Sequence, residues 1–172
     1  GISIAFREGI VNPGCFALTR LNFGAIINPL TRREDTVETI CHVRGTLPLQ
    51  ITGRVIQGKK IGRRLGFPTA NIAYPEDGCD MPCGVYLALL TLPEGQVLHG
   101  ILNHGHHPTL PDGPPAVEVH LLDFAGDLYG QVVQVTYLRF MRPEMKFPTV
   151  EAMQQQVIGD IAEAKQWFQE NP

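Results

Sequence analysis

Short apolar stretches with alternating polar positions, separated by glycine and proline turns, fill the chain from Thr46 onward. They predict strands at 49–56, 84–91, 97–102, 116–123 and 131–140. Short strands at this spacing, with no helices between them, are typical of an antiparallel barrel or sandwich. We therefore expect a mainly β domain over residues 46–172.

The hydrophobic period changes near the C-terminus. The apolar positions are then three or four residues apart, at Val150, Met153, Val157, Ile161, Ala164 and Phe168. This spacing lines them along one face of a helix. Thr149 suits the N-cap, and Glu151 suits the positive end of the helix dipole. We expect a long helix that packs its apolar stripe on the barrel, with Phe168 in the core rather than against a cofactor.

The first 45 residues have a different pattern. Their apolar stretches are broken at Asn12-Pro13-Gly14 and Asn28-Pro29, and the clearest element is a short helix from about Arg33 to Val43. We expect residues 1–45 to be an N-terminal extension ahead of the β domain.

Composition narrows the classes of protein. Hydrophobic residues make up 44% of the chain and charged residues 18%, as in a globular protein with a core. The net charge of −3 gives no overall basic field for nucleic acid. The four cysteines are widely spread, which favours a reducing, cytoplasmic setting. No apolar run approaches the roughly 20 residues that cross a bilayer. We expect a monomer with neither nucleic-acid nor membrane partners.

A glycine-rich basic segment follows the first predicted strand. Gly58, Gly62 and Gly66 are four residues apart, with Lys59, Lys60, Arg63 and Arg64 between them. Glycines let backbone N–H groups approach an anion, and the basic side chains can neutralise phosphate. The segment is not a P-loop, because the Gly-Lys-Ser/Thr ending is missing. Phosphate binding and an ordinary hairpin loop both remain open on this pattern.

The next residues, Phe67-Pro68-Thr69-Ala70-Asn71, form a stiff segment. Pro68 fixes its own φ and biases Phe67 toward extended geometry. Thr69 and Asn71 then point to one face, where a hydroxyl and an amide oxygen could ligate Mg²⁺ beside phosphate oxygens. An edge strand with polar residues facing solvent explains the same pattern equally well.

The segment from Val117 to Leu121 alternates between apolar and polar residues. Glu118 and His120 therefore share the face opposite the apolar one. A carboxylate on a strand that faces a cleft can accept a proton from an alcohol. A solvated glutamate is the commoner case for this pattern.

Two metal-site interpretations carry less weight. Cys79-x-x-x-Cys83 offers half a zinc site, but no four ligands assemble from neighbouring positions. His104-x-His106-His107 has no accompanying carboxylate or cysteine pattern. We expect the segment 103–108 to be a turn, with Asn103 and Gly105 supplying unusual backbone angles.

Taken in order, these segments resemble the riboflavin kinase family, including the kinase half of bifunctional bacterial FAD synthetases. The similarity runs from about Leu49 to Phe168. The matching segments are Gly53-Arg54-Val55, Gly62-Arg63 through Asn71, Gly84-Val85-Tyr86, Asn103-x-Gly105-x-x-Pro108-Thr109, Val117 through Phe124, Asp127-Leu128-Tyr129-Gly130, Arg142 through Phe147, and the helix with Gln156 and Asp160.

The resemblance implies a six-stranded antiparallel Greek-key β-barrel with a C-terminal α-helix. It implies a kinase that transfers the γ-phosphate of ATP to riboflavin, with Glu118 as general base and Mg²⁺ near Thr69 and Asn71. The implied ATP-binding residues are Gly58, Lys59, Gly62, Arg63, Pro68, Thr69 and Asn71. The implied flavin-binding residues are Asp127, Tyr129, Met141, Arg142 and Glu144.

The resemblance does not extend over the first 45 residues. They leave no room for an adenylyltransferase domain, although the segment 14–24 is faintly similar to the first strand of one. We therefore expect a remnant of that domain and no FAD synthetase activity in this chain. The alternative hypothesis is a non-catalytic flavin- or nucleotide-binding regulatory module on the same fold.

Overall fold

The computed structural model of the protein describes residues 40–41, 45–58, 60–76, 78–106 and 115–172. Most of the short helix expected at 33–43 lies outside these residues. Ile40–Cys41 is described, and it forms strand β1, so the helix prediction is wrong at these two positions. Backbone pairing with β2 (Leu49–Ile56), through Ile40 with Thr52 and Cys41 with Ile51, decides their conformation.

The predicted strands are present, and two further elements appear between them. The strands after β2 are β3 (Thr69–Ile72), β4 (Gly84–Thr91), β5 (Val97–Gly105), β6 (Ala116–Leu121) and β7 (Val132–Pro143). Helix α1 (Ile61–Arg64) is a single turn where the sequence predicted a loop, and α2 (Val150–Glu170) is the long C-terminal helix. β5 continues to Gly105, so Asn103 lies in a strand and its assignment to a turn is wrong.

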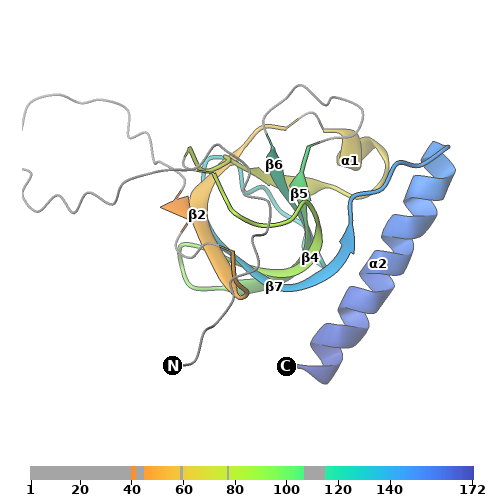
Figure 1. Ribbon diagram of the computed structural model, residues 1–172. Helices are drawn as coiled ribbons and strands as arrows, with labels where there is room; N and C mark the ends of the chain where they lie inside the picture. Colours follow the sequence, from red (N-terminus) through yellow and green to blue (C-terminus); the bar gives the residue numbers. More distant parts are fainter. Residues whose placement is uncertain (1–39, 42–44, 59, 77, 107–114) are drawn as a thin grey trace, which may run out of the picture. The chain divides into compact units, whose positions relative to one another are not determined.

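The strands close into an antiparallel barrel in the order β2-β3-β6-β5-β4-β7, with β7 pairing back onto β2 (Figure 1). β4, β5 and β6 follow one another as neighbours. β7 then returns beside β4, and β3 lies beside β6, which is Greek-key connectivity. The predicted six-stranded Greek-key barrel with a C-terminal helix is confirmed.

Alternation along the strands separates the two faces of the barrel wall. Inward positions form one cluster, whose fully buried members include Leu49, Ile51, Tyr86, Leu90, Leu102, Val119, Val135 and Tyr137. β3 is half-buried and pairs with β2 on one side and β6 on the other, so it is not an edge strand.

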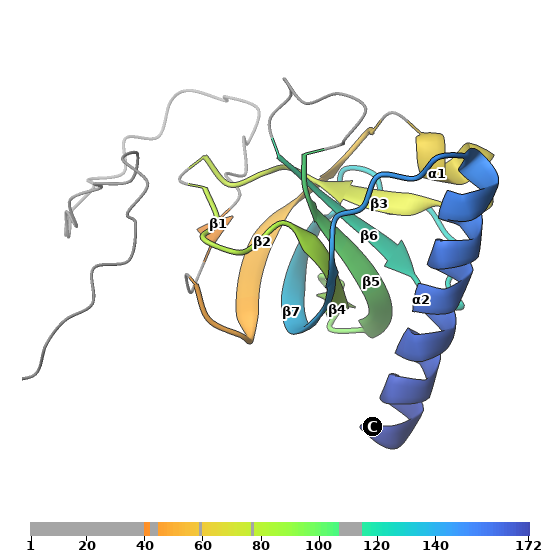
Figure 2. The ribbon, with the colours of Figure 1, turned by 45° about the vertical axis from the view of Figure 1, so that its right-hand side comes forward.

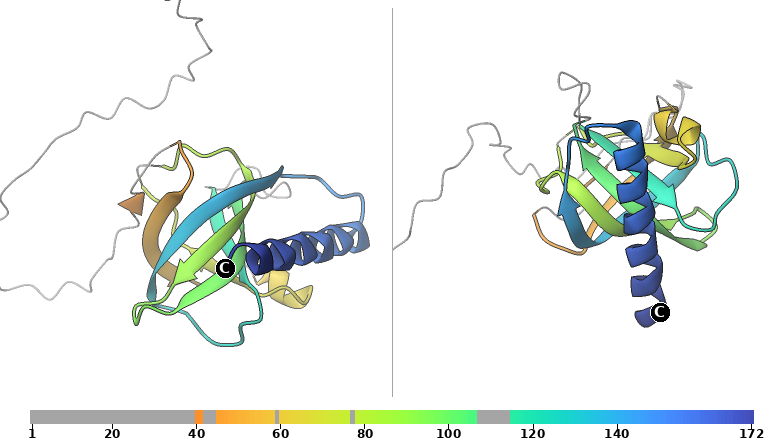
Figure 3. Two further views of the ribbon diagram at one scale, coloured as in Figure 1. Left: turned by 90° about the horizontal axis from the view of Figure 1, so that it is seen from below. Right: turned by 90° about the vertical axis from the view of Figure 1, so that its right-hand side faces the viewer.

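Helix α2 covers part of the outer face, along the side of the barrel (Figure 3). Ala164 and Phe168 pack there against Val85, Leu87 and Ile101, which confirms the expected core role of Phe168. The ring of Phe168 also stacks on the ring of His99 in β5, with 4.1 Å between the centroids. Thr149 caps the helix as predicted, because its hydroxyl accepts from the N–H of Ala152 at 3.1 Å.

One histidine lies inside the barrel. His104 is 1% exposed and shares a hydrogen bond of 2.9 Å with the Tyr137 hydroxyl, beside the ring of Tyr74. Burial, and to a lesser extent the charge of His106, lowers the pKa of His104 from 6.5 to about 4. The imidazole is therefore neutral at physiological pH and belongs to the core.

This burial makes stability depend on pH. The unfolded chain binds a proton at His104 below pH 6.5, whereas the folded chain does so only near pH 4. The free energy of unfolding should therefore fall by up to about 3 kcal/mol as the pH decreases through this window. We expect His104→Gln to lose this part of the slope in urea denaturation measured from pH 7.5 to 4. Equal slopes in both proteins would contradict the assignment.

Candidate active site

A row of polar side chains crosses three neighbouring strands on the outer face of the barrel. Asn71 of β3 pairs with Glu118 of β6, which pairs in turn with Asn103 of β5. Directly paired residues point to one face, with Cβ atoms about 4.5–5.5 Å apart. Val117 and Val119 are buried on the other face, so the row lies outside. We call Asn71, Glu118 and Asn103 the polar row.

The polar row ends near helix α2. Asn103 pairs with Val85 of β4, which pairs with Arg142 of β7. One step along the wall, Thr69 pairs with His120, and His120 with Ile101. The outer wall therefore changes from polar residues on β3, β6 and β5 to the apolar patch under α2.

Helix α1 forms a closed turn at the start of β3, next to the N-terminal end of α2 (Figure 2). The N–H of Phe67 donates to Gly62 O at 2.8 Å, which closes the turn. A Cβ on Gly62 would lie 2.4 Å from the Phe67 carbonyl oxygen, so only glycine fits. Arg63 and Arg64 are exposed in the last turn, and they place positive charge beside β3.

The loop before α1 packs against the amide of Asn71. A Cβ on Gly58 would lie 2.4–2.5 Å from the side-chain atoms of Asn71. The Asn71 Nδ2 is 3.5 Å from Thr69 O, so the amide lies along its own strand. Gly58 therefore provides the space in which the Asn71 side chain sits.

Thr69 and Asn71 fit the chemistry of a hard divalent cation. They contribute a hydroxyl and an amide oxygen from one face of β3, and Mg²⁺ prefers oxygen ligands completed by phosphate and water. In the described part of the chain, no group of three or more His, Cys, Asp or Glu residues could hold a metal. Any ion at this place would need further oxygens from a substrate.

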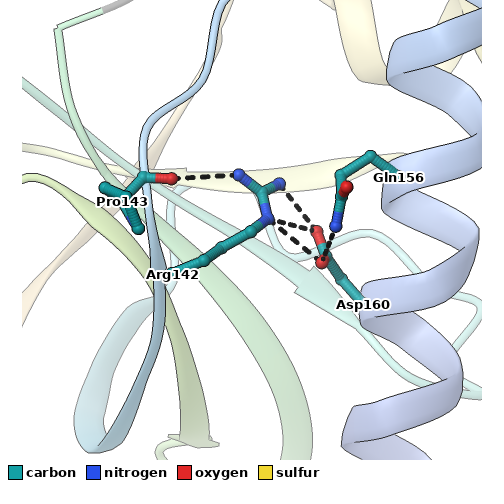
Figure 4. A network of polar contacts seen from close by, with 4 residues as sticks. All are labelled: Arg142, Pro143, Gln156 and Asp160. Carbon is teal, nitrogen blue, oxygen red and sulfur yellow. Dashed lines mark hydrogen bonds and ion pairs between the residues drawn. The ribbon is translucent and has the colours of Figure 1, made fainter.

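Arg142 is bound by helix α2 (Figure 4). Its Nε lies 3.1 and 3.0 Å from the two carboxylate oxygens of Asp160, and its Nη2 lies 2.7 Å from Oδ2. Gln156 donates to the same carboxylate at 2.9 Å, and Arg142 Nη1 donates to Pro143 O at 3.1 Å. The side chains of Arg142 and Asp160 are 17% and 7% exposed. This pair joins the end of β7 to the middle of α2.

Glu144 reaches the same wall from the segment after β7. Its carboxylate atoms lie 2.4–2.5 Å from the place where a Cβ of Gly105 would be. Gly105 pairs with Ala116, one outward position along from the pair of Asn103 and Glu118. The carboxylate of Glu144 is thus placed beside the polar row.

The residues that the resemblance assigned to flavin fall into two groups. Asp127 and Tyr129 lie in the β6–β7 loop, where Asp127 Oδ1 accepts from the N–H of Tyr129 at 2.9 Å. Met141 and Arg142 lie at the far end of β7, and Glu144 follows that end. At about 3.3 Å per residue, roughly 40 Å of strand contour separates the groups. Lys59, which the resemblance assigned to ATP rather than to flavin, is outside the described part.

Sequence reasoning missed several residues around the site. Asn103 was assigned to a turn, and His120 was given no role although its alternation with Glu118 placed it on the same face. His120 Nδ1 lies 2.9 Å from Pro68 O, and Gln154 of α2 donates to Leu65 O at 3.4 Å. Only His120 carried a usable signal, since the other contacts join segments far apart in sequence.

Comparison with known proteins identifies the family. The model of the family described as Flavokinase, riboflavin kinase, matches residues 46–168. The chain belongs to the riboflavin kinase family. The family assignment made from the sequence motifs is thereby confirmed.

Curated relatives are longer than this chain. A bifunctional riboflavin kinase/FMN adenylyltransferase from Haemophilus influenzae is 40% identical over 154 residues, which is 90% of this chain and 49% of the relative. The chain thus spans about half the length of that protein. A match of this extent cannot come from 46–172 alone, so it takes in part of residues 1–45.

Solved structures share the fold. A macrolide-efflux protein from Streptococcus pneumoniae matches with a TM-score of 0.62 and 29% identity, over 70% of this chain and 39% of that chain. Riboflavin kinase from Trypanosoma brucei matches with a TM-score of 0.51 and 21% identity, over 72% and 82%. At that identity, the second likeness supports the barrel fold alone.

Among the described helices, none is long and apolar enough to cross a membrane.

The Arg142–Asp160 ion pair should contribute more to stability than the exposed ion pair of the same helix. Asp160→Asn leaves a largely buried guanidinium without its counter-charge, and we expect a loss of about 2 kcal/mol in the free energy of unfolding. Lys165→Gln removes another ion pair of the same helix, to Asp123 at 2.6 Å, whose side chains are 43% and 76% exposed. It should cost less than about 0.5 kcal/mol. Equal losses in urea denaturation would contradict this ranking.

Proposed function

We propose that this chain is an ATP-dependent riboflavin kinase, which transfers the γ-phosphate of ATP to the 5′-hydroxyl of riboflavin and forms FMN. The observation that supports the proposal is the pairing of Glu118 with Asn71, and of the adjacent Thr69 with His120, on one outer wall. A carboxylate base is thereby held one strand away from two oxygen ligands. Phosphoryl transfer needs little more than such positioning together with charge neutralisation.

Glu118 is the general base in this proposal. Its carboxylate would accept the proton of the 5′-hydroxyl while the hydroxyl oxygen attacks the γ-phosphorus and ADP leaves. The rigid β6 strand holds Glu118 between Asn71 and Asn103. A base on a paired strand keeps its direction during the reaction, unlike a base on a free loop.

The nucleotide phosphates lie on the same wall in this proposal. Thr69 and Asn71 would hold Mg²⁺, which when bound neutralises charge on the phosphate oxygens. Arg63 and the backbone N–H groups of the α1 segment would face the remaining phosphate charge, together with Gly58, Lys59, Gly62 and Pro68. Gly58 contributes by leaving room for the Asn71 amide.

The flavin would approach from the other side of Glu118. Glu144 lies beside the polar row, and Met141 packs in the apolar patch under α2. We include Arg142 among the flavin-side residues, and its guanidinium is bound to Asp160. We place the ribityl chain over Glu118 and the ring toward Met141 and Glu144, whereas Asp127 and Tyr129 lie at the other end of β7.

The kinase domain of this proposal spans residues 46–172, and residues 1–45 are a segment that precedes it. The curated relatives are named as bifunctional enzymes, and part of residues 1–45 matches one of them. We propose a cytoplasmic monomer that acts on small-molecule substrates and makes FMN.

Replacing the proposed base should abolish turnover. Glu118→Gln keeps the size of the side chain but cannot accept the proton, and we expect a fall in kcat of about 10²–10⁴-fold. Chromatographic separation of riboflavin, FMN and FAD, after incubation with Mg²⁺-ATP, measures this directly. Asn103→Asp is the control, because it changes the charge of the polar row at a neighbouring position and leaves Glu118 in place.

The same chromatogram tests the competing functions. Absence of FMN from the wild-type protein, together with tight flavin binding, would replace the kinase by a non-catalytic binding module. FAD among the products would show that the protein also transfers an adenylyl group to FMN. Full activity of Glu118→Gln would remove Glu118 from the mechanism.

Filling the space beside Asn71 should impair the phosphate side selectively. In Gly58→Ala, the new methyl group must displace the Asn71 amide, which can swing away without unfolding the chain. We expect the KM for Mg²⁺-ATP to rise about tenfold, or about 1.4 kcal/mol, with a small change in melting temperature. Gly159→Ala is the matched control, because no atom lies within 4 Å of its new Cβ. Equal kinetics of the two variants would contradict the role of Gly58.

A further inference from the structure

We propose that His120 is a positioning residue, which sets the place of the α1 turn, residues 60–68, relative to Glu118. The inference rests on the proposed kinase function, in which the α1 turn binds the nucleotide phosphates. Its geometry rests on the contacts that β6, β3 and α2 make with the turn. His120 is assigned no role by the motifs that identify the family in this sequence.

His120 lies on the same wall as the proposed base. It is two residues after Glu118 on β6, so both side chains point outward. Its pairing partner across the strands is Thr69, whereas the partner of Glu118 is Asn71. One strand therefore presents a carboxylate and an imidazole to the two proposed ligands of the neighbouring strand.

The imidazole holds the residue that precedes β3. His120 Nδ1 lies 2.9 Å from Pro68 O, and a carbonyl oxygen only accepts, so Nδ1 carries the hydrogen. The ring of Phe67 packs edge-on against the imidazole, with 6.0 Å between centroids and 87° between planes. His120 thus contacts the last two residues of the α1 turn, directly before β3.

This contact joins two units that are each stiff. Thr69 with His120 is the last pair of the β3–β6 ladder on this side, so no ladder pair holds Pro68 or Phe67. The α1 turn is closed on itself by the bond from Phe67 N to Gly62 O. Its link to α2, from Gln154 to Leu65 O, is long at 3.4 Å. The short His120 bond therefore decides where the turn sits on the wall.

Position matters because phosphoryl transfer depends on alignment. A shift of about 1 Å in a positioning group can cost on the order of 10²-fold in rate. Without the His120 bond, the α1 turn would lose its register with Thr69 and Asn71. The nucleotide would then bind less tightly, while the flavin side of Glu118 would be unchanged.

Three substitutions separate positioning from other roles. Asn places an amide nitrogen where Nδ1 was, so His120→Asn can still donate to Pro68 O. His120→Gln places its amide where Nε2 was, and His120→Ala donates nothing. We expect the dissociation constant of Mg²⁺ with a non-hydrolysable ATP analogue to rise at least tenfold in the Gln and Ala variants. In the Asn variant it should stay within threefold of wild type.

Calorimetry measures that dissociation constant, and steady-state kinetics measures the KM for ATP separately from the KM for riboflavin. The KM for ATP should follow the dissociation constant, and the KM for riboflavin should not change. Gln50→Ala, which removes a side-chain hydrogen bond from Gln50 to Thr136 at 3.3 Å between β2 and β7, is the control. Melting temperatures show whether each variant folds, and the Asn and Gln variants form a pair of nearly equal size.

Each outcome decides the proposal. Wild-type-like nucleotide binding in all three variants would reduce the contact to an ordinary surface hydrogen bond. Equal impairment of all three, Asn included, would instead indicate direct contact through Nε2, and would also overturn positioning. If the wild-type protein makes no FMN but the Asn and Gln variants still differ in nucleotide binding, the kinase proposal fails and the role of His120 stands. Absence of nucleotide binding in the wild type would overturn both.

Discussion

The antiparallel register of β3, β6 and β5 is the constraint on which the site depends. It pairs Asn71 with Glu118 and Glu118 with Asn103. Side chains alternate with period two, so a slip of one residue would turn Glu118 into the barrel and expose Val117 and Val119. Burial of those valines therefore fixes the direction of the carboxylate. The hydrophobic core and the proposed chemistry are two faces of the same register.

Helix α2 extends this arrangement beyond the barrel wall. Its C-terminal half buries Phe168 and Ala164 on the outer face, and this burial supplies most of the attachment. Polar residues of its first three turns contact both ends of the proposed site, through Asp160 to Arg142 and through Gln154 to Leu65. The helix therefore links the segment after β7 to the α1 turn, which no strand pairing does.

The sequence predicted the parts of the fold that depend on local pattern. β2 and β4 match their predicted ranges because their alternation or apolar run is bounded by clear turn residues. β3 was not predicted as a paired strand, because Thr69-Ala70-Asn71 is short and polar and gains its conformation from two distant neighbours. The contacts around the site were hidden for the same reason. His120 and Pro68 are 52 residues apart, and Gln154 and Leu65 are 89 apart.

The glycines of the basic segment show how structure changes the meaning of a pattern. Their spacing suggested backbone freedom and close approach to an anion, but only Gly66 has a positive φ, of 89°. Gly58 and Gly62 are required instead because the Asn71 amide and the Phe67 carbonyl occupy the space of a Cβ. Two of the three glycines thus serve contacts within the protein. Gly58 leaves room for the proposed ligand Asn71, and Gly62 allows the α1 turn to close, before any phosphate arrives. This lowers the cost of ordering the site when substrate binds.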